Sequence, residues 1–219
     1  ETAQSHVAKG QYDKAADLLA YTATRYENSA WYAQEGKKTL DAARAEVMVV
    51  AKRLLAAVAA PLPDGRTLWH VPTVYGTDLA PQLEEAAEVA GLDPDEAIRQ
   101  LSTARVRVLT IGFAPGQPYL GELDPVWNIP RQQGLTKSVP AGALVVAIRQ
   151  LVVFTNATPT GWRHVGQTGF RTFRQNAPQP FALTPGDEMI FPSVSKSAFE
   201  KIRAQDSGGN GGAERETLS

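Results

Sequence analysis

The chain has 219 residues, of which 43% are hydrophobic and 21% charged, and its formal net charge is -1. This length can bury a sizeable core in one or two domains. The near-neutral charge argues against nucleic acid or an anionic membrane as the main partner. The absence of cysteine excludes disulfides, thiol catalysis and zinc–thiolate sites. Three separated histidines form no H-x-x-x-H pattern, so no metal is expected.

No apolar run approaches the roughly 18 residues that a membrane-spanning helix requires. The longest candidate, over 46–60, is interrupted by Lys52 and Arg53. No signal-peptide pattern is visible either. We therefore expect a cytoplasmic protein with no membrane partner.

The first hundred residues are predicted to be mostly helical. Residues 1–60 are rich in alanine and charge, with apolar residues at helical spacing, and 61–68 is predicted to be a linker because it is rich in proline. Two further helices are expected within 79–104, where Gly91 would cap the first, and Asp93 and Pro94 would begin the second. The acidic start of that second helix argues against DNA binding.

From residue 105 onward, short apolar runs alternate with glycine and proline clusters, which predicts a β-barrel or sandwich. We expect short strands at 68–76 and 105–113, one long β segment at 142–155, further strands within 161–174 and 186–191, and a final helix at 195–204. Residues 69–205 would thus form a β domain with a two-helix insertion, giving an α+β protein. The glycine-rich stretch 206–219 is predicted to be a disordered tail.

Three loops carry the candidate functional residues. The stretch "GFAPGQPYLG" (112–121) matches neither a Walker A sequence nor G-x-G-x-x-G, and is interpreted as a structural turn or a ligand loop. Over 128–142, Arg131 and Lys137 could hold a carboxylate or phosphate, or be solvated surface cations. Over 155–166, His164 could be a general base or a structural histidine. These patterns give no complete catalytic set.

Five motifs, in register, resemble the KipI / allophanate hydrolase subunit 1 family, which includes the B subunit of a three-subunit 5-oxoprolinase. They are "VPTVYG…DLAPQLEEAAEVAGL", "TIGFAPGQPYLGELD", "IPRQQGL…VPAGALVVAIRQ", "TPTGWRHVGQT" and "LTPGDEMIF". The resemblance covers about residues 66–195. It implies a cyclophilin-like β-barrel preceded by a small ferredoxin-type domain, of which the helical segment 1–60 would be a truncated or divergent form.

The resemblance also implies a function. The chain would be a subunit of an ATP-dependent 5-oxoprolinase that opens 5-oxo-L-proline to L-glutamate, together with a KipA-like partner and a LamB/YcsF-like subunit. ATP would bind within the complex, and the chain would be inactive alone. The alternatives are a subunit of a biotin-dependent urea or allophanate-type carboxyltransferase, and a KipI-type inhibitor of a sensor histidine kinase.

Under this resemblance, His164 is the expected proton handler, and Gln117 would polarise an amide carbonyl together with backbone N–H groups. Trp162 would form a wall of the cleft, and Arg131 and Lys137 would hold an anionic group. The full set of expected ligand-binding residues is Gly112, Phe113, Pro115, Gly116, Tyr119, Arg131, Lys137, Gln150 and Trp162.

Overall fold

The computed structural model describes residues 49, 62 and 64–218. The chain divides into two compact units, Glu1–Leu62 and Pro63–Ser219. The helical segment predicted at 1–60 lies outside the described residues, apart from Val49. The helices and strands over 64–218 all belong to the second unit.

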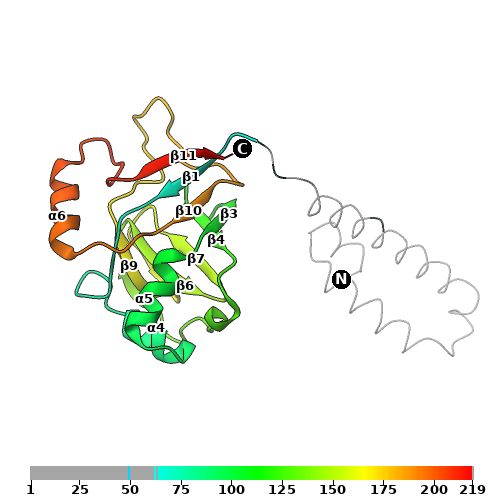
Figure 1. Ribbon diagram of the computed structural model, residues 1–219, viewed down its shortest axis with the longest axis vertical. Coiled ribbons are helices and arrows are strands. Elements are labelled where there is room, and N and C mark those ends of the chain that lie inside the picture. The colour runs from blue at the N-terminus through cyan, green and yellow to red at the C-terminus, as the bar shows by residue number, and fades with distance from the viewer. Residues whose placement is uncertain (1–48, 50–61, 63, 219) are drawn as a thin grey trace, which may run out of the picture. The chain divides into compact units, whose positions relative to one another are not determined.

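The second unit combines one large sheet with a few short helices, in agreement with the predicted α+β class (Figure 1). None of the helices described over 64–218 is long and apolar enough to traverse a lipid bilayer. In chain order the elements are β1 (Arg66–His70), β2 (Thr73–Tyr75), α4 (Leu83–Ala90), α5 (Pro94–Thr103), β3 (Val106–Ile111), β4 (Pro118–Gly121), the 3₁₀ helix η2 (Pro125–Trp127), β5 (Thr136–Val139), β6 (Ala143–Ala147), β7 (Gln150–Val153), β8 (Thr158–Thr160), β9 (Arg163–Thr168), β10 (Glu188–Ile190), α6 (Lys196–Gln205) and β11 (Glu214–Leu218).

The nine-stranded sheet has the order β11-β1-β10-β3-β4-β7-β6-β9-β2, and β5 pairs separately with β8. Strand β1 is second in this order and β2 is last, yet only Val71 and Pro72 lie between them in the chain. The sheet must therefore curl until β2 returns beside the segment that comes after β10. A parallel bridge between Thr73 and Ser193 marks this return, and the result is a curled half-barrel.

The two faces of the sheet bury different sets of side chains, because neighbouring residues of a strand point to opposite sides. On β6, Leu144 and Val146 join the main core, which also holds Leu83 of α4 and Leu101 of α5. The alternate residues of β6 lie on the other face in a smaller cluster made of Val139, Ala143, Val145, Ala147, Val152, Phe154 and Trp162.

The two helices of the insertion lie within the predicted range 79–104 and use the predicted caps. Gly91 adopts a left-handed conformation (φ 71°) after α4. The Asp93 carboxylate accepts a hydrogen bond from the backbone N–H of Glu96 at the start of α5 (2.9 Å), where Pro94 occupies the first turn.

Two predicted boundaries are wrong. Strand β1 begins at Arg66, so the last part of the predicted linker 61–68 belongs to the sheet. The predicted disordered tail 206–219 instead contains β11, which pairs antiparallel with the whole of β1. The glycines between α6 and β11 let this segment cross close to the backbone after β9. A Cβ at Gly211 would lie 2.3 Å from the carbonyl carbon of Gly169.

The predicted long strand at 142–155 is also wrong, because it is a tight hairpin of β6 and β7. The residues at its turn, Ile148 and Arg149, both have positive φ (45° and 62°), as a two-residue hairpin turn requires. Neighbouring backbone holds the turn: the N–H of Ile148 donates to the carbonyl of Ile129 (2.8 Å) and that of Arg149 to the carbonyl of Trp127 (2.9 Å). A pattern of apolar residues does not reveal this turn, which is fixed by tertiary contacts.

Candidate functional site

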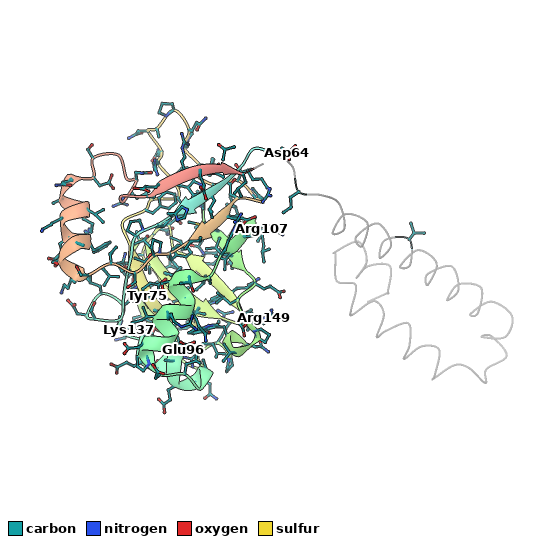
Figure 2. All side chains as sticks on the ribbon, viewed as in Figure 1. Asp64, Tyr75, Glu96, Arg107, Lys137 and Arg149 are labelled. Carbon is teal, nitrogen blue, oxygen red and sulfur yellow. The ribbon has the colours of Figure 1, made fainter. Side chains whose placement is uncertain are left out.

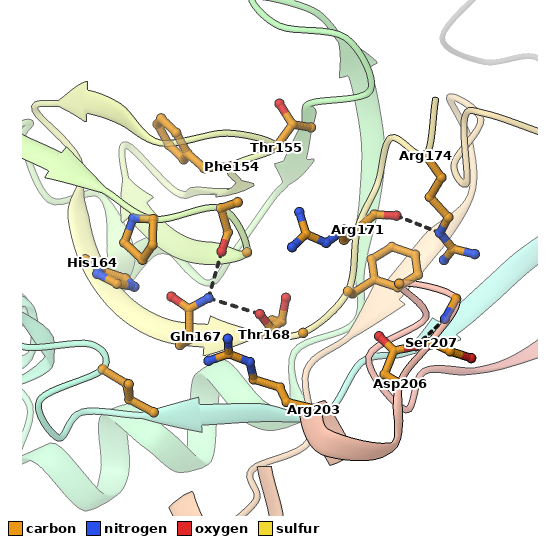
Figure 3. Close-up of a pocket in the computed structure, with 18 of the residues that line it drawn as sticks. Phe154, Thr155, His164, Gln167, Thr168, Arg171, Arg174, Arg203, Asp206 and Ser207 are labelled. Atoms are coloured by element: carbon orange, nitrogen blue, oxygen red, sulfur yellow. Dashed lines mark hydrogen bonds between the residues drawn. The ribbon is translucent and has the colours of Figure 1, made fainter. Parts of the chain in front are cut away.

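A cavity of about 1000 Å³ lies beside β9, bounded by the segments before β6 and after β7, by the loop after β9, and by the end of α6 with its adjoining loop (Figure 3). Among the described residues, no group of three or more His, Cys, Asp or Glu side chains could hold a metal ion. The lining residues that carry hydrogen-bonding or charged groups include His164, Gln167, Thr168, Arg171, Arg174, Arg203 and Asp206.

An irregularity in β9 brings His164 and Gln167 to the same face of the sheet. His164 pairs with Val145 of β6 and Gln167 pairs with Ala143, while the register shifts between them. Val145 and Ala143 are two residues apart, so they point to the same side. The extra residue in β9 acts as a β-bulge, which redirects a side chain in this way.

His164 is buried, with 4% of its surface exposed, and its Nε2 atom has no hydrogen-bond partner in the described structure. Burial lowers the pKa of its imidazole, and the neighbouring Gly166 backbone and Gln167 side chain partly oppose this shift. The imidazole is therefore neutral near pH 7. A neutral ring has one donor and one acceptor nitrogen, so it can bind or relay a proton at a ligand.

The Gln167 amide is fixed in orientation. Its Nε2 donates to the carbonyls of Ala141 (2.9 Å) and Thr168 (3.0 Å), while its Oε1 has no partner. The hydroxyl of Thr168 also lacks a partner. Buried polar atoms are almost always hydrogen-bonded in native proteins. We call the three side chains His164, Gln167 and Thr168 the neutral end of the cavity; their unpaired atoms suit a ligand with donor and acceptor groups.

Three arginines, Arg171, Arg174 and Arg203, form what we call the arginine cluster. Arg174 is held by the carbonyl of Arg171 (3.1 Å) and the side chain of Asn210 (3.3 Å), and it stacks over Phe170. In the described part of the chain, Arg171 and Arg203 have no carboxylate within ion-pairing distance. Figure 3 shows both side chains extending toward the space beside Gln167 and Thr168.

The two carboxylates at the cavity are already engaged. Asp206 accepts hydrogen bonds from the backbone N–H groups of Gly208, Asn210 and Gly211 at 2.9 to 3.2 Å. Asp78 pairs with Lys196 (2.7 Å). The cavity therefore presents surplus positive charge together with neutral polar groups, an arrangement suited to a small anion that also carries an amide.

Of the residues expected from the sequence, His164 lines this cavity. Tyr119 lies on the same face of the sheet, because the pairings Tyr119–Val152, Val152–Val145 and Val145–His164 form one row across four strands. Three strand spacings separate the ends of this row, roughly 14 Å on a flat sheet. Trp162 packs edge-on against Tyr119, with ring centroids 6.3 Å apart, and belongs to the smaller core cluster rather than to the cavity wall.

The stretch 112–121 does not open into the cavity. Gln117 is buried (1% exposed), and its backbone N–H is used within the loop, donating to Ala114 (3.1 Å). Gly116 packs against Thr172 and Phe173, while Phe113 is 76% exposed. The second half of the stretch is not loop but strand β4.

The remaining candidates are spread over other surfaces. Arg131 is exposed beside Gly161, and Lys137 is exposed on β5 (Figure 2). Gln150 is half-buried at the start of β7. The structure therefore does not bring Arg131, Lys137 and Gln117 together with His164, and their expected roles remain predictions.

Sequence reasoning missed Gln167, Thr168 and the arginine cluster. Arg171 and Arg174 come directly after the β9 segment, and this repeated arginine beside Gly169 was the available signal. Asp206 was missed because the stretch after α6 was interpreted as a tail, and Arg203 was missed although it lies within the predicted final helix. These residues meet through contacts between segments far apart in the sequence.

Comparisons with known proteins identify the family to which this chain belongs. The family model for "Carboxyltransferase domain, subdomain C and D" matches residues 25–183. The chain is 32% identical to the 5-oxoprolinase B subunit of Bacillus subtilis (strain 168) over 151 residues, which is 69% of this chain and 63% of that protein. It is 34% identical to the 5-oxoprolinase B subunit of Escherichia coli O157:H7 over 129 residues, 59% of each chain. The chain thus spans less than two thirds of these relatives.

Two solved structures are similar as well. The crystal structure of TTHA0988 in space group P212121 matches with a TM-score of 0.55 and 30% identity, over 66% of this chain and 28% of that chain. The urea carboxylase of Kluyveromyces lactis matches with a TM-score of 0.57 and 17% identity, over 91% of this chain and 21% of that chain. At that identity the second likeness concerns the fold alone.

Proposed function

Because the chain belongs to the carboxyltransferase-domain subdomain C and D family, with 5-oxoprolinase B subunits among its relatives, we propose that it is a subunit of an ATP-dependent 5-oxoprolinase. The complex would convert 5-oxo-L-proline to L-glutamate together with a KipA-like and a LamB/YcsF-like subunit, and the chain would be inactive alone. We assign the curled half-barrel to the cyclophilin-like fold of this family.

The proposal rests on two features found in one cavity. Within the described residues, its neutral polar groups lack hydrogen-bond partners, and two of its guanidinium groups lack carboxylate partners. 5-Oxo-L-proline is a cyclic amide that bears a carboxylate. In this proposal Gln167 Oε1 would accept from the lactam N–H, and the neutral His164 imidazole would donate to the lactam oxygen. A guanidinium of the arginine cluster can bind the carboxylate with two parallel hydrogen bonds.

This arrangement addresses the difficulty of the reaction. An amide carbonyl is a poor electrophile, and donors placed at its oxygen stabilise the negative charge that develops as water attacks. Within the complex, ATP would supply the phosphoryl group that activates the lactam oxygen. The contribution of this chain would be to hold the lactam ring and its carboxylate in a fixed orientation, which lowers the entropic barrier.

The test is 5-oxo-L-proline-dependent ATP hydrolysis by this chain alone and by the chain co-purified with its two proposed partners. We expect activity in the full complex and none with the chain alone. A stable complex that hydrolyses ATP no faster with 5-oxo-L-proline than without it would contradict the proposal.

A second candidate is a subunit of a biotin-dependent urea or allophanate-type carboxyltransferase, which the description of the matching family model favours. In that case the neutral end would bind urea or a similar amide, and the carboxyl group would come from biotin on a partner. Amide-dependent decarboxylation of carboxybiotin by the purified complex would distinguish this function from 5-oxoprolinase activity.

A further inference from the structure

We propose that the arginine cluster is a phosphate subsite, separate from the neutral end of the cavity. The existence of this site rests on the geometry of Arg171, Arg174 and Arg203. The identity of its physiological ligand rests on the proposed function.

The charge of the cluster exceeds what a single carboxylate requires. One arginine satisfies one carboxylate in a bidentate pair, whereas three arginines line this cavity. Asp206 keeps its negative charge and acts on Arg174, so it offsets about one of the three positive charges and leaves the cluster cationic. A phosphate group, with more acceptor oxygens and more charge than a carboxylate, matches several guanidinium groups at once.

The arginine stems are held in place by close packing against glycines. A Cβ at Gly209 would lie 3.3 Å from three carbons of the Arg171 side chain, and a Cβ at Gly169 would lie 3.6 Å from Cγ of Arg203. Arg203 also stacks over Phe199, at 5.7 Å from the ring centroid. These contacts limit the directions that the stems of the two exposed arginines can take, so less side-chain entropy is lost when an anion binds.

The cavity also has room for two chemical groups. Ligand pockets of roughly 300–1,000 Å³ accommodate drug-sized molecules, and this cavity, at about 1000 Å³, lies at the top of that range. A cyclic amide at the neutral end therefore leaves space at the arginine cluster. In the proposed reaction this space would hold the phosphate groups of a nucleotide, or the phosphate released from it.

The experiment is calorimetric titration of the full-length chain, without partners, with inorganic phosphate, pyrophosphate and ATP. We expect pyrophosphate and ATP to bind more tightly than phosphate, and Arg171→Ala and Arg203→Ala each to weaken binding by about tenfold or more. Equal affinities for pyrophosphate and ATP would show that the site recognises the phosphate groups alone. Tighter binding of ATP would show that the chain also contacts the nucleoside.

The matched control is Arg99→Ala on α5, an arginine that pairs with Glu96 outside the cavity, which should bind as the wild type does. Circular dichroism of each variant confirms folding. Absence of binding by every phosphate probe, or binding unaffected by both cluster substitutions, would overturn the proposal. Phosphate binding in a complex that lacks 5-oxo-L-proline-dependent ATP hydrolysis would sink the proposed function and leave the phosphate subsite standing.

Discussion

Gln82 and His164 hold each other through a reciprocal pair of hydrogen bonds. The backbone N–H of Gln82 donates to the carbonyl of His164 (3.1 Å), and the side-chain Oε1 of Gln82 accepts from the backbone N–H of His164 (3.0 Å). Gln82 precedes α4 and His164 lies in β9, so this pair fixes the helix against the strand that carries the cavity's imidazole.

Replacement of Gln82 by alanine should therefore destabilise the protein. It removes the acceptor for the His164 N–H and also the donor to Gln132 Oε1 (2.8 Å). Leaving a partly buried backbone group unpaired costs about 1–3 kcal/mol, which urea unfolding will measure. Gln133→Ala, at an exposed position, is the control. Equal stability of the two variants would mean that the pair does not secure β9.

Gly211→Ala should be among the most damaging substitutions in the loop after α6. Gly211 has φ 57°, and a Cβ there would lie 2.3 Å from the backbone nitrogen of Phe170. Left-handed strain and overpacking together should cost about 2–4 kcal/mol. Gly208→Ala is the matched control, because a Cβ at that position meets nothing within 4 Å. The same thermal-unfolding midpoint for both variants would contradict the close contact between Gly211 and the backbone of Gly169 and Phe170.

Removal of residues 214–219 should lower the melting temperature by roughly 5 °C or more. The deletion removes β11, whose five residues pair with Arg66 to His70, and it exposes β1 as a new sheet edge that invites aggregation. Deletion of Ser219 alone is the control. A truncated chain that melts like the wild type, and remains monodisperse, would show that β11 contributes nothing to the sheet.

The stability of the fold should depend on the protonation of His164. Burial lowers the pKa of this imidazole below its ordinary value of 6.5, so the unfolded chain gains the proton at a higher pH than the folded chain does. Protonation of this histidine therefore costs little free energy of unfolding above pH 6.5. The free energy of unfolding decreases progressively as the pH falls below that value.

Urea unfolding at pH 7.5 and pH 5.5 will measure this loss. In His164→Gln the decrease in free energy of unfolding between the two pH values should be smaller than in the wild type. Gln133→Ala, which changes no titratable group at an exposed position, should keep the wild-type decrease. An unchanged decrease in His164→Gln would mean that the imidazole is not held neutral by burial.

Local chemistry made some of these elements predictable. Gly91, Asp93 and Pro94 place helix ends whatever the rest of the fold does, and α4 and α5 lie where these residues predict. The single strand predicted at 68–76 is wrong, because the structure has two strands, β1 and β2, on either side of Pro72.

The cavity could not be predicted in the same way. The bulge that turns His164 and Gln167 to one face depends on the register between β9 and β6. The glycines after α6 have the composition of a flexible tail, yet Gly211 packs directly against Gly169. Such contacts depend on the whole fold, whereas the motifs over 112–121 and 128–142 reflect local conformation.

The proposed function requires the neutral end of the cavity to bind the amide substrate. The most direct measurement is kcat/KM for 5-oxo-L-proline-dependent ATP hydrolysis by the reconstituted complex containing wild-type chain, His164→Asn, Gln167→Leu or Arg99→Ala. We expect a loss of about tenfold or more for the two cavity variants, in complexes that still assemble, and wild-type activity for Arg99→Ala. Full activity of both cavity variants would contradict it.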